Sequence, residues 1–516
     1  KAGEQDMARY KSIDRNPRLL PVVLSEQIQP GTFEFALDHL VDNELDLSAL
    51  DARFCNDETG ASAYDPRVML KIVLLAYSRG LISSRRIEAA CLHNVQFIAI
   101  SGDSQPSYTH IAKFVRELKD QIHPLFTQVL LTCDRIGLIG RQMFAIDGVK
   151  LPCNASKERS GTHEELLHRA ARLDKAADKI LALHQAQDVG GDGPSTLDAA
   201  RQARMDELRR EARATRDFVA RREPRRSERG QELKSNVTDP DSAKMATGKG
   251  VIQGYAAQAA VDSAHQVIVA ADVTGSGSEQ NMLLPMIEAS APVRAAQTLI
   301  TADAGYHSSD NVNALSESGI AALVADNQMR QRDERYAQQA KHKAKGEVLH
   351  DKRTPGTSPN PKVVGFYGTE DFVFNADNTC TCPAGCTLRS SGALYTAGRY
   401  KRQDYKARAS DCQDCLHRPK CIRNAHTPSR KVTVHHRQPD DPNDPIHRMR
   451  AAIDSVQGRQ LYSQRIATVE PVFANIRHNK RLSRFTLRGK AKVGTQWRLF
   501  CLVHNIEKLA NVAGSA

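Results

Sequence analysis

Three acidic residues occupy positions where a carboxylate could do chemistry. Asp147 interrupts the apolar residues 143–149, where a charge is costly unless it binds something. Asp303 follows the apolar residues 298–302, and open α/β sheets bind ligands beyond the ends of such strands. Glu470 precedes a strongly basic segment. Taken singly, each residue is better explained as a turn, a helix cap or a surface ion pair.

Taken together, the three carboxylates suit a divalent-metal site. Mg²⁺ prefers oxygen ligands, commonly one or two carboxylates with substrate phosphates completing the shell. Two such ions can activate a water or hydroxyl and stabilise the leaving oxygen of a phosphodiester. The predicted chemistry is therefore metal-assisted phosphodiester transfer.

The elements that must position these residues begin with a helical region at residues 1–139. A helix is predicted at 66–77, because an aspartate and a proline precede residues of helical apolar spacing, and shorter helices follow. Lys113, Arg116 and Lys119 lie on the exposed side of the last one. This set suits a helix-turn-helix DNA-binding unit and an ordinary three-helix bundle equally well.

Residues 140–328 have the pattern of an α/β core. Strands are predicted at 143–149, 251–261, 265–273, 298–302 and 321–325, and helices at 278–289 and 311–318. Asp147 then lies on the first strand, Asp303 after the fourth, and Glu470 on a late helix. A ribonuclease-H-like fold builds its catalytic site from these three places.

Two polar stretches interrupt this pattern. Residues 157–235 are predicted to be an Arg-rich helical insertion, either a solvated hairpin or a contact for DNA or a partner protomer. Residues 329–445 are rich in Pro and Gly and form a Cys-rich insertion. Residues 446–516 are predicted to complete the core with a catalytic helix and a basic tail.

Six of the eleven cysteines crowd into the second insertion: Cys380, Cys382, Cys386, Cys412, Cys415 and Cys421. They could form a four-thiolate zinc site with two spare thiols or a six-cysteine cluster sharing metals, and His417 or His426 could substitute. An iron–sulfur cluster and plain reduced thiols are the alternatives. The scattered cysteines are predicted to be reduced and buried.

The C-terminal region contains a helix-breaking residue and a basic segment. Pro471 lacks an amide hydrogen, so a kink or a new helix start is predicted just after Glu470. The segment Arg477–Arg498 has eight Lys or Arg and no acid, which favours contact with DNA. Trp497 is predicted to belong to the core rather than to a stacking surface.

Composition narrows the class of protein. A chain of 516 residues suggests two to four domains, and 40% hydrophobic with 26% charged residues argues against wholesale disorder and membrane residence. The net charge of +12 favours a polyanionic partner, and 5% aromatics favours duplex phosphate contact over serial base stacking. The first residues show no apolar signal region, so a cytoplasmic location is predicted.

Four stretches also carry a family resemblance: residues 145–156, Thr301–His307, Val469–Arg477 and 487–506. In them the chain resembles the bacterial insertion-sequence transposases with a DDE catalytic domain. The helical N-terminal region is similar to that family's own N-terminal domain, so the resemblance runs from about residue 20 to about residue 510.

The resemblance implies an α/β fold with a ribonuclease-H-like mixed sheet and flanking helices, an all-helical N-terminal domain before it and the two insertions within it. It implies that Asp147, Asp303 and Glu470 bind Mg²⁺ or Mn²⁺, as two ions. Water would cut a phosphodiester at the element's end, and the released 3′-hydroxyl would attack target DNA. The implied DNA contacts are Tyr462, Arg465, Arg477, Lys480, Arg481, Arg484, Arg488 and Lys490. In the third-acid motif, one extra residue precedes Glu470, and Arg477 stands where the family has Lys.

The implied partners are double-stranded DNA, as element ends and as target, and a second copy of the chain in a synaptic complex. No membrane partner is expected, and the protein is predicted to associate with the bacterial nucleoid. Two other functions compete with this one: a stand-alone metal-dependent nuclease that cuts without joining, and an inactive domesticated DNA-binding protein.

Overall fold

The computed structural model describes residues 22–513, except 54–61, 189–198, 228–229, 249, 337–366, 391, 393, 398–399, 423, 425 and 438–442. The chain divides into two compact units. One takes in the described parts of residues 1–327 and 452–516, and the other those of residues 328–451. The second unit matches the predicted Cys-rich insertion to within a few residues.

The N-terminal region is helical, as predicted. Its elements are η1 (Leu24–Gln27), α1 (Phe33–Asn43), α2 (Ser48–Asp51), α3 (Pro66–Ser78), α4 (Ser84–His93), α5 (Val95–Ser101), α6 (Tyr108–Glu117), η2 (Leu118–Asp120) and α7 (Ile122–Arg135). Asp65 caps α3, because its Oδ1 accepts a hydrogen bond of 2.7 Å from the amide of Arg67. Helix α3 is buried along most of its length and forms the centre of this region.

A mixed six-stranded sheet follows. Its strands are β1 (Met143–Pro152), β4 (Ala243–Thr247), β5 (Gly250–Asp262), β6 (Ile268–Thr274), β7 (Leu299–Ala302) and β8 (Ala322–Val324). The long strand β5 pairs antiparallel with β1 on one side and with β4 and then β6 on the other. β7 is parallel to β1 and to β8. The five predicted strands are present in the predicted order, with α10 (Leu283–Ala289) and α11 (Ser309–Glu317) as their helices, and β4 is an additional strand that was not predicted.

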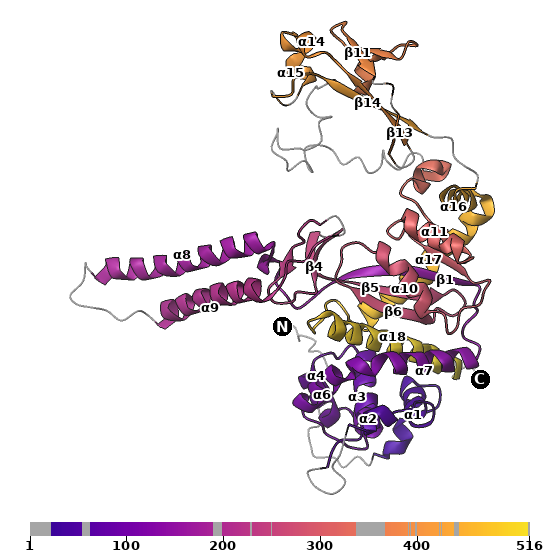
Figure 1. The fold of residues 1–516 in the computed structure, drawn as a ribbon. Coiled ribbons are helices and arrows are strands. Elements are labelled where there is room, and N and C mark those ends of the chain that lie inside the picture. Colours follow the sequence, from indigo (N-terminus) through magenta and orange to yellow (C-terminus); the bar gives the residue numbers. More distant parts are fainter. Residues whose placement is uncertain are drawn as a thin grey trace, which may run out of the picture. The chain divides into compact units, whose positions relative to one another are not determined.

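Helices from the end of the chain complete this sheet. They are α17 (Val456–Ala474), the π-helical turn η9 (Asn475–Asn479) and α18 (Lys490–Ala513), whereas most of α16 (Pro445–Asp454) belongs to the second unit. α17 packs on β1, β5 and β7, whereas α18 packs on β6 and also on α1, α3 and α7 (Figure 1). Helix α18 therefore joins the N-terminal helices and the sheet into one unit. The architecture is the predicted ribonuclease-H-like α/β fold.

A kink or a new helix start was predicted just after Glu470. Helix α17 continues through Pro471, so the second alternative, a new helix start, is wrong. A proline leaves the carbonyl four residues earlier without its helical donor. Here that carbonyl belongs to Ala467, and it accepts a hydrogen bond of 3.2 Å from Nε2 of Gln266. A side chain from the loop before β6 thus replaces the lost backbone donor and lets the helix continue.

The Arg-rich insertion is a helical hairpin, as predicted. Helices α8 (His163–Asp188) and α9 (Ala199–Arg221) lie side by side in Figure 1. Ala177, Met205 and Leu208 form the buried seam between them. The short elements η3 (Lys157–Arg159), β2 (Ser160–Gly161) and β3 (Ser235–Asn236) connect the hairpin to the core.

The second unit contains a six-stranded sheet that the sequence pattern did not indicate. Its strands are β9 (Val373–Phe374), β10 (Thr379–Thr381), β11 (Thr387–Ser390), β12 (Tyr395–Ala397), β13 (Tyr400–Lys406) and β14 (Lys431–Arg437). The remaining elements are η5 (Met329–Arg332), η6 (Glu334–Tyr336), η8 (Thr369–Asp371), α14 (Ala409–Gln413) and α15 (Arg418–Cys421). Most of these strands are short and polar, which is why hydrophobic alternation missed them.

Among the described helices, none combines the length and the apolar character that a membrane crossing needs.

Candidate active site

The two predicted aspartates are neighbours at one end of the parallel strand pair β1 and β7. The last paired residues of that ladder are Ile146 and Ala302, so Asp147 and Asp303 are the next residue on each strand. Adjacent strands lie about 4.8 Å apart. The strand register therefore brings together two carboxylates that are 156 positions apart in the sequence.

Each aspartate is oriented by the glycine that follows it. The amide of Gly148 donates to Oδ1 of Asp147, and the amide of Gly305 donates to Oδ1 of Asp303, both at 2.8 Å. These bonds leave the second oxygen of each carboxylate available for another partner. For Asp147 that partner is Arg465, whose Nη1 lies 2.8 Å from Oδ2.

Arg465 supplies the positive charge of this site. Its side chain is 10% exposed and that of Asp147 is 21% exposed, so the ion pair is largely shielded from water. Burial raises the pKa of Asp147, and the charge of Arg465 only partly opposes this effect. Tyr462, one helical turn earlier on α17, stacks its ring against the Arg465 guanidinium at 5.7 Å. Both predicted DNA contacts thus face the aspartates from α17.

The third predicted acid, Glu470, is placed differently. It lies exposed on α17, and its side chain makes no ion pair or hydrogen bond within the described residues. At 100° per residue it lies about 140° around the helix from Arg465. Across the described ranges, no three His, Cys, Asp or Glu side chains already form a group that could hold a metal ion. The structure thus brings Asp147 and Asp303 together and leaves Glu470 outside their contacts.

A fourth acid that the sequence analysis missed lies at the same place. Glu279 follows β6 and is half-buried beside Gly148 and Gly305. Burial raises its pKa most, Asp303 and Asp147 raise it further, and the charge of Lys150 opposes them. The signal that could have found it is a glycine shortly after each of the two aspartates, because such glycines leave room for another side chain.

The predicted DNA-contact residues of the tail differ in accessibility. Five are exposed: Arg477, Arg481, Arg484, Arg488 and Lys490. Lys480 is the exception, because its side chain is 1% exposed and forms an ion pair of 2.5 Å with Glu507 of α18. The prediction that Lys480 contacts DNA is therefore corrected: this lysine holds two helical segments together under the surface.

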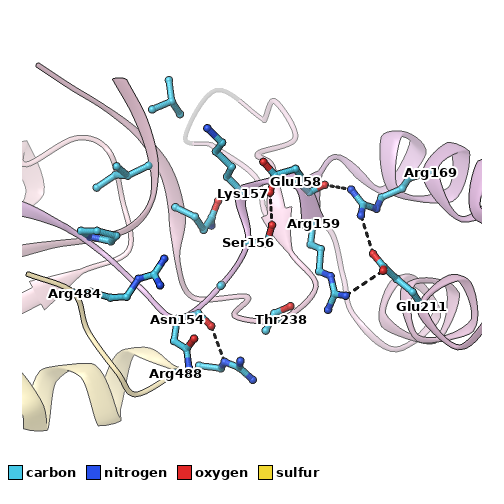
Figure 2. A pocket seen from close by; sticks show the side chains of 15 residues that line it. Asn154, Ser156, Lys157, Glu158, Arg159, Arg169, Glu211, Thr238, Arg484 and Arg488 are labelled. Atoms are coloured by element: carbon cyan, nitrogen blue, oxygen red, sulfur yellow. Dashed lines mark hydrogen bonds and ion pairs between the residues drawn. The ribbon is translucent and has the colours of Figure 1, made fainter. Parts of the chain in front are cut away.

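A basic cleft lies beyond the far end of β1, about 17 Å along the strand from Asp147 to Pro152. It has a volume of about 920 Å³ and is lined by the chain after β1, by the helical hairpin and by the basic tail. Its charged residues are Lys157, Arg159, Arg169, Arg484 and Arg488 against Glu158 and Glu211, a formal charge of +3. Figure 2 shows these side chains around the cleft.

The cations of the cleft are not equally available. Arg159 and Arg169 both bind Glu211, at 3.1 Å and 2.7 Å, and Arg488 donates to the carbonyl of Asn154 at 2.8 Å (Figure 2). Lys157 and Arg484 have no ion-pair partner in the described part of the chain. The cleft therefore has arginines that are held in place by partners within the protein, and at least two cations, Lys157 and Arg484, that are available to bind an anion.

The cysteine cluster lies in the second unit. Five of its thiols, those of Cys382, Cys386, Cys412, Cys415 and Cys421, line one small cavity together with His417. Cys380 lies instead in the apolar core of this unit and is fully buried. His426 is exposed and is not part of the cavity lining. Of the six predicted cysteine ligands, five thus line one cavity, and Cys380 lies in the core outside that cavity.

The turn between Cys382 and Cys386 is tight, because the amide of Cys382 donates to the carbonyl of Cys386 at 2.9 Å and Gly385 has a positive φ of 79°. His417 is engaged by the hydroxyl of Tyr367 at 2.7 Å. Of the scattered cysteines, Cys91, Cys133, Cys153 and Cys501 are free and buried as predicted, and Cys55 lies outside the described residues.

Comparison with known families agrees with this arrangement. The family model "Transposase DDE domain" matches residues 381–510, which contain α17, α18 and most of the cysteine cluster. The model "Transposase domain (DUF772)" matches residues 22–117, the N-terminal helices. No curated protein matches the chain. Two separate transposase matches, in the expected order around a ribonuclease-H-like sheet, support the resemblance to the insertion-sequence transposases of the DDE type.

Proposed function

We propose that this transposase binds the ends of its element and carries out metal-dependent cleavage and strand transfer through Asp147, Asp303 and Glu470. The main support is the parallel register that makes Asp147 and Asp303 adjacent beside a helix of the matched DDE domain. DNA is the substrate class of the family. The alternatives are a nuclease that cuts without joining and an inactive DNA-binding protein.

The donor chemistry of the site fits a divalent cation. Two carboxylates stand side by side, and the cation that already compensates one of them is a guanidinium at 2.8 Å. Burial raises the pKa of Asp147 despite this partner, so the carboxylate gains from further positive charge. Asp147 and Asp303 would hold Mg²⁺ or Mn²⁺, as two ions, with Glu470 as the third ligand. The bound metal would supply a nucleophilic water and stabilise the leaving oxygen.

The protein's own residues would do the positioning. Gly148 and Gly305 fix one oxygen of each aspartate, and Arg465 binds the second oxygen of Asp147. Tyr462 and Arg465 on α17 lie next to the aspartates and could hold a phosphate once Arg465 leaves Asp147. In the first transfer an oxygen of water bonds to phosphorus and the bond to the 3′ oxygen breaks. In the second transfer that 3′ oxygen bonds to a target phosphorus, the bond from this phosphorus to the target's own 3′ oxygen breaks, and the released oxygen takes up a proton as a new 3′-hydroxyl.

The basic cleft supports a path for DNA beside the carboxylates. Lys157 and Arg484 would contact backbone phosphates, and the arginines held by partners within the protein would keep the cleft positive. Lys113 and Arg116 on α6 are exposed and could contact the same DNA elsewhere. Because phosphate contacts release counterions, binding should weaken steeply with salt. Since two ends must be held together, we expect a homodimer in the synaptic complex, associated with the nucleoid.

The cysteine cavity favours a structural zinc. Thiolates are the ligands that tetrahedral zinc prefers, and five of them surround one space in a unit with a small core. Four of the five would bind the ion and fix the turn of Cys382 and Cys386 to α14 and α15. The catalytic chemistry would stay with the carboxylates.

Asp147→Asn tests the main proposal. We expect it to abolish Mg²⁺-dependent cleavage of element ends while binding of those ends persists, because an amide loses the charge and keeps the shape. Asp310→Asn, at an exposed position of α11, is the matched control. Loss of end binding as well would show that Asp147 is structural. Precut ends separate the enzymatic alternatives, because a simple nuclease gives no joined product.

A further inference from the structure

We propose that Glu279 is an additional carboxylate of the divalent-metal site, beside Asp147 and Asp303, and that it contributes to metal affinity. This inference rests on the proposed metal-dependent function. Glu279 is outside both matched family segments and outside the three acids of the predicted triad.

The Glu279 carboxylate lies beside two glycines, Gly148 and Gly305, where a larger residue would leave it little room. A Cβ atom on Gly148 would lie 2.8 Å from Oε1 of Glu279, and one on Gly305 would lie 3.2 Å from Oε2. Gly148 follows Asp147 directly, and Gly305 is two residues after Asp303. One oxygen of Glu279 therefore faces each aspartate-bearing turn, and both turns lack the side chain that would fill this space.

Helix capping does not account for Glu279. It stands at the N-cap of η4 (Gln280–Met282), yet its side chain makes no capping hydrogen bond. No ion pair neutralises it within the described residues, and it is half-buried. A shielded carboxylate without a paired cation is unfavourable unless a cation joins it.

The surrounding charges favour such a cation. Asp147, Asp303 and Glu279 interact electrostatically with one another, and the basic groups that act on them are Arg465 and Lys150. Three acidic groups against two basic ones leave a formal net charge of −1 at this end of the sheet. A divalent ion would therefore be stabilised by Glu279 as well as by the aspartates.

A buried amide also points at Glu279. Gln258 is fully buried on β5, and its Oε1 accepts the hydroxyl hydrogen of Tyr306. Its Nε2 is buried without a hydrogen bond of good geometry in the described chain and lies near the Glu279 carboxylate, where it slightly opposes the rise that burial causes in the pKa of Glu279. Tyr306 follows Asp303 by three residues. Gln258 thus connects the loop of Asp303 to Glu279.

The test measures Mn²⁺ binding to the full-length protein by the loss of the free-ion electron paramagnetic resonance signal, without DNA. We expect Glu279→Gln to weaken Mn²⁺ affinity at least tenfold and Glu279→Asp, which withdraws the carboxylate by one methylene, to weaken it less. Glu288→Gln, at an exposed position of the neighbouring helix α10, is the matched control and should bind like the wild type.

Asp147→Asn serves as the reference for the proposed function in the same titration. If Glu279→Gln binds Mn²⁺ as the wild type does while Asp147→Asn does not, the role of Glu279 is refuted and the metal site of the aspartates stands. If Asp147→Asn also binds normally, the proposed metal-dependent function itself fails. Should Glu279→Gln unfold, Glu279→Asp decides, because unchanged Mn²⁺ affinity in that variant overturns the inference.

Discussion

The ion pair between Arg465 and Asp147 should contribute measurably to folding stability. It joins α17 to β1, two elements 318 positions apart, and both side chains are largely buried. Breaking a buried pair by removing one partner costs about 3–5 kcal/mol, because the other charge is left uncompensated. Asp147 keeps some exposure and its bond from Gly148, so we expect Arg465→Met to lose about 3 kcal/mol, the lower limit of that range.

The chain carries its own reporter for this measurement. Trp497 is the single tryptophan, is fully buried on α18 and stacks against Phe473 of α17 at 6.3 Å. Urea unfolding followed by its fluorescence therefore reports the unit that contains the ion pair. Arg477→Met, at an exposed position of η9, is the control and should change stability little.

The pH dependence gives the sign of the effect. Burial raises the pKa of Asp147 in the folded protein, so its ionised form lowers stability above the unfolded pKa of about 3.9. Removing Arg465 raises the pKa of Asp147 further, because the charge of Arg465 opposes the effect of burial. The loss in the free energy of unfolding caused by Arg465→Met should therefore become smaller as the pH falls through the raised pKa of Asp147.

A double-mutant cycle can refute this reasoning. In an Asp147→Asn background no buried charge is left behind, so Arg465→Met should cost about 1 kcal/mol or less, the value of a neutral hydrogen bond. An equal loss in both backgrounds would mean that Arg465 acts through packing, and the electrostatic account of the site would be wrong.

Three further predictions concern other parts of the chain. His504 is buried on α18, and burial lowers its pKa to about 3. At pH 5 the histidine is protonated in the unfolded chain and neutral in the folded one, so the free energy of unfolding should fall by about 2 kcal/mol between pH 7 and pH 5. His504→Gln should remove this loss in urea unfolding at the two pH values, and exposed His478→Gln is the control. Arg484→Ala should reduce the slope of log K against log salt for DNA binding by about 1, whereas Lys480→Met should leave the slope unchanged and lower thermal stability. Cys415→Ser should lower the zinc content measured by mass spectrometry of the purified protein, while Cys501→Ser should not.

The sequence predicted the core well because its elements depend on local patterns. Strong apolar runs gave β1, β5, β6 and β7, and the aspartate and proline before α3 marked its start. Asp147 and Asp303 were found for the same reason, since each stands where an apolar run ends or is interrupted. Local pattern and tertiary structure agree wherever one face of an element is buried.

The sequence failed where a residue's role depends on distant partners. Lys480 looks like any other cation of the basic tail, and only Glu507 on α18 shows that it is buried. Pro471 looks like a helix break, and only Gln266 from another element compensates it. Glu279 has no unusual local context, because the glycines that make room for it come from β1 and from the loop after β7. The hydrophobic periodicity of a sequence does not report such contacts between distant residues.

Helix α18 connects these observations, since it supports the candidate site from beneath. Nε1 of Trp497 donates to the carbonyl of Gln258 at 2.9 Å, and Asn505 bonds both the amide and the carbonyl of Ile268 on β6. The side chain of Gln258 in turn binds Tyr306 and acts on Glu279. Helix α18 carries no predicted catalytic residue, yet it holds β5 and β6, and Gln258 of β5 contacts the residues around the carboxylates. This gives a physical reason for a DDE-domain match that extends to residue 510, far beyond Glu470.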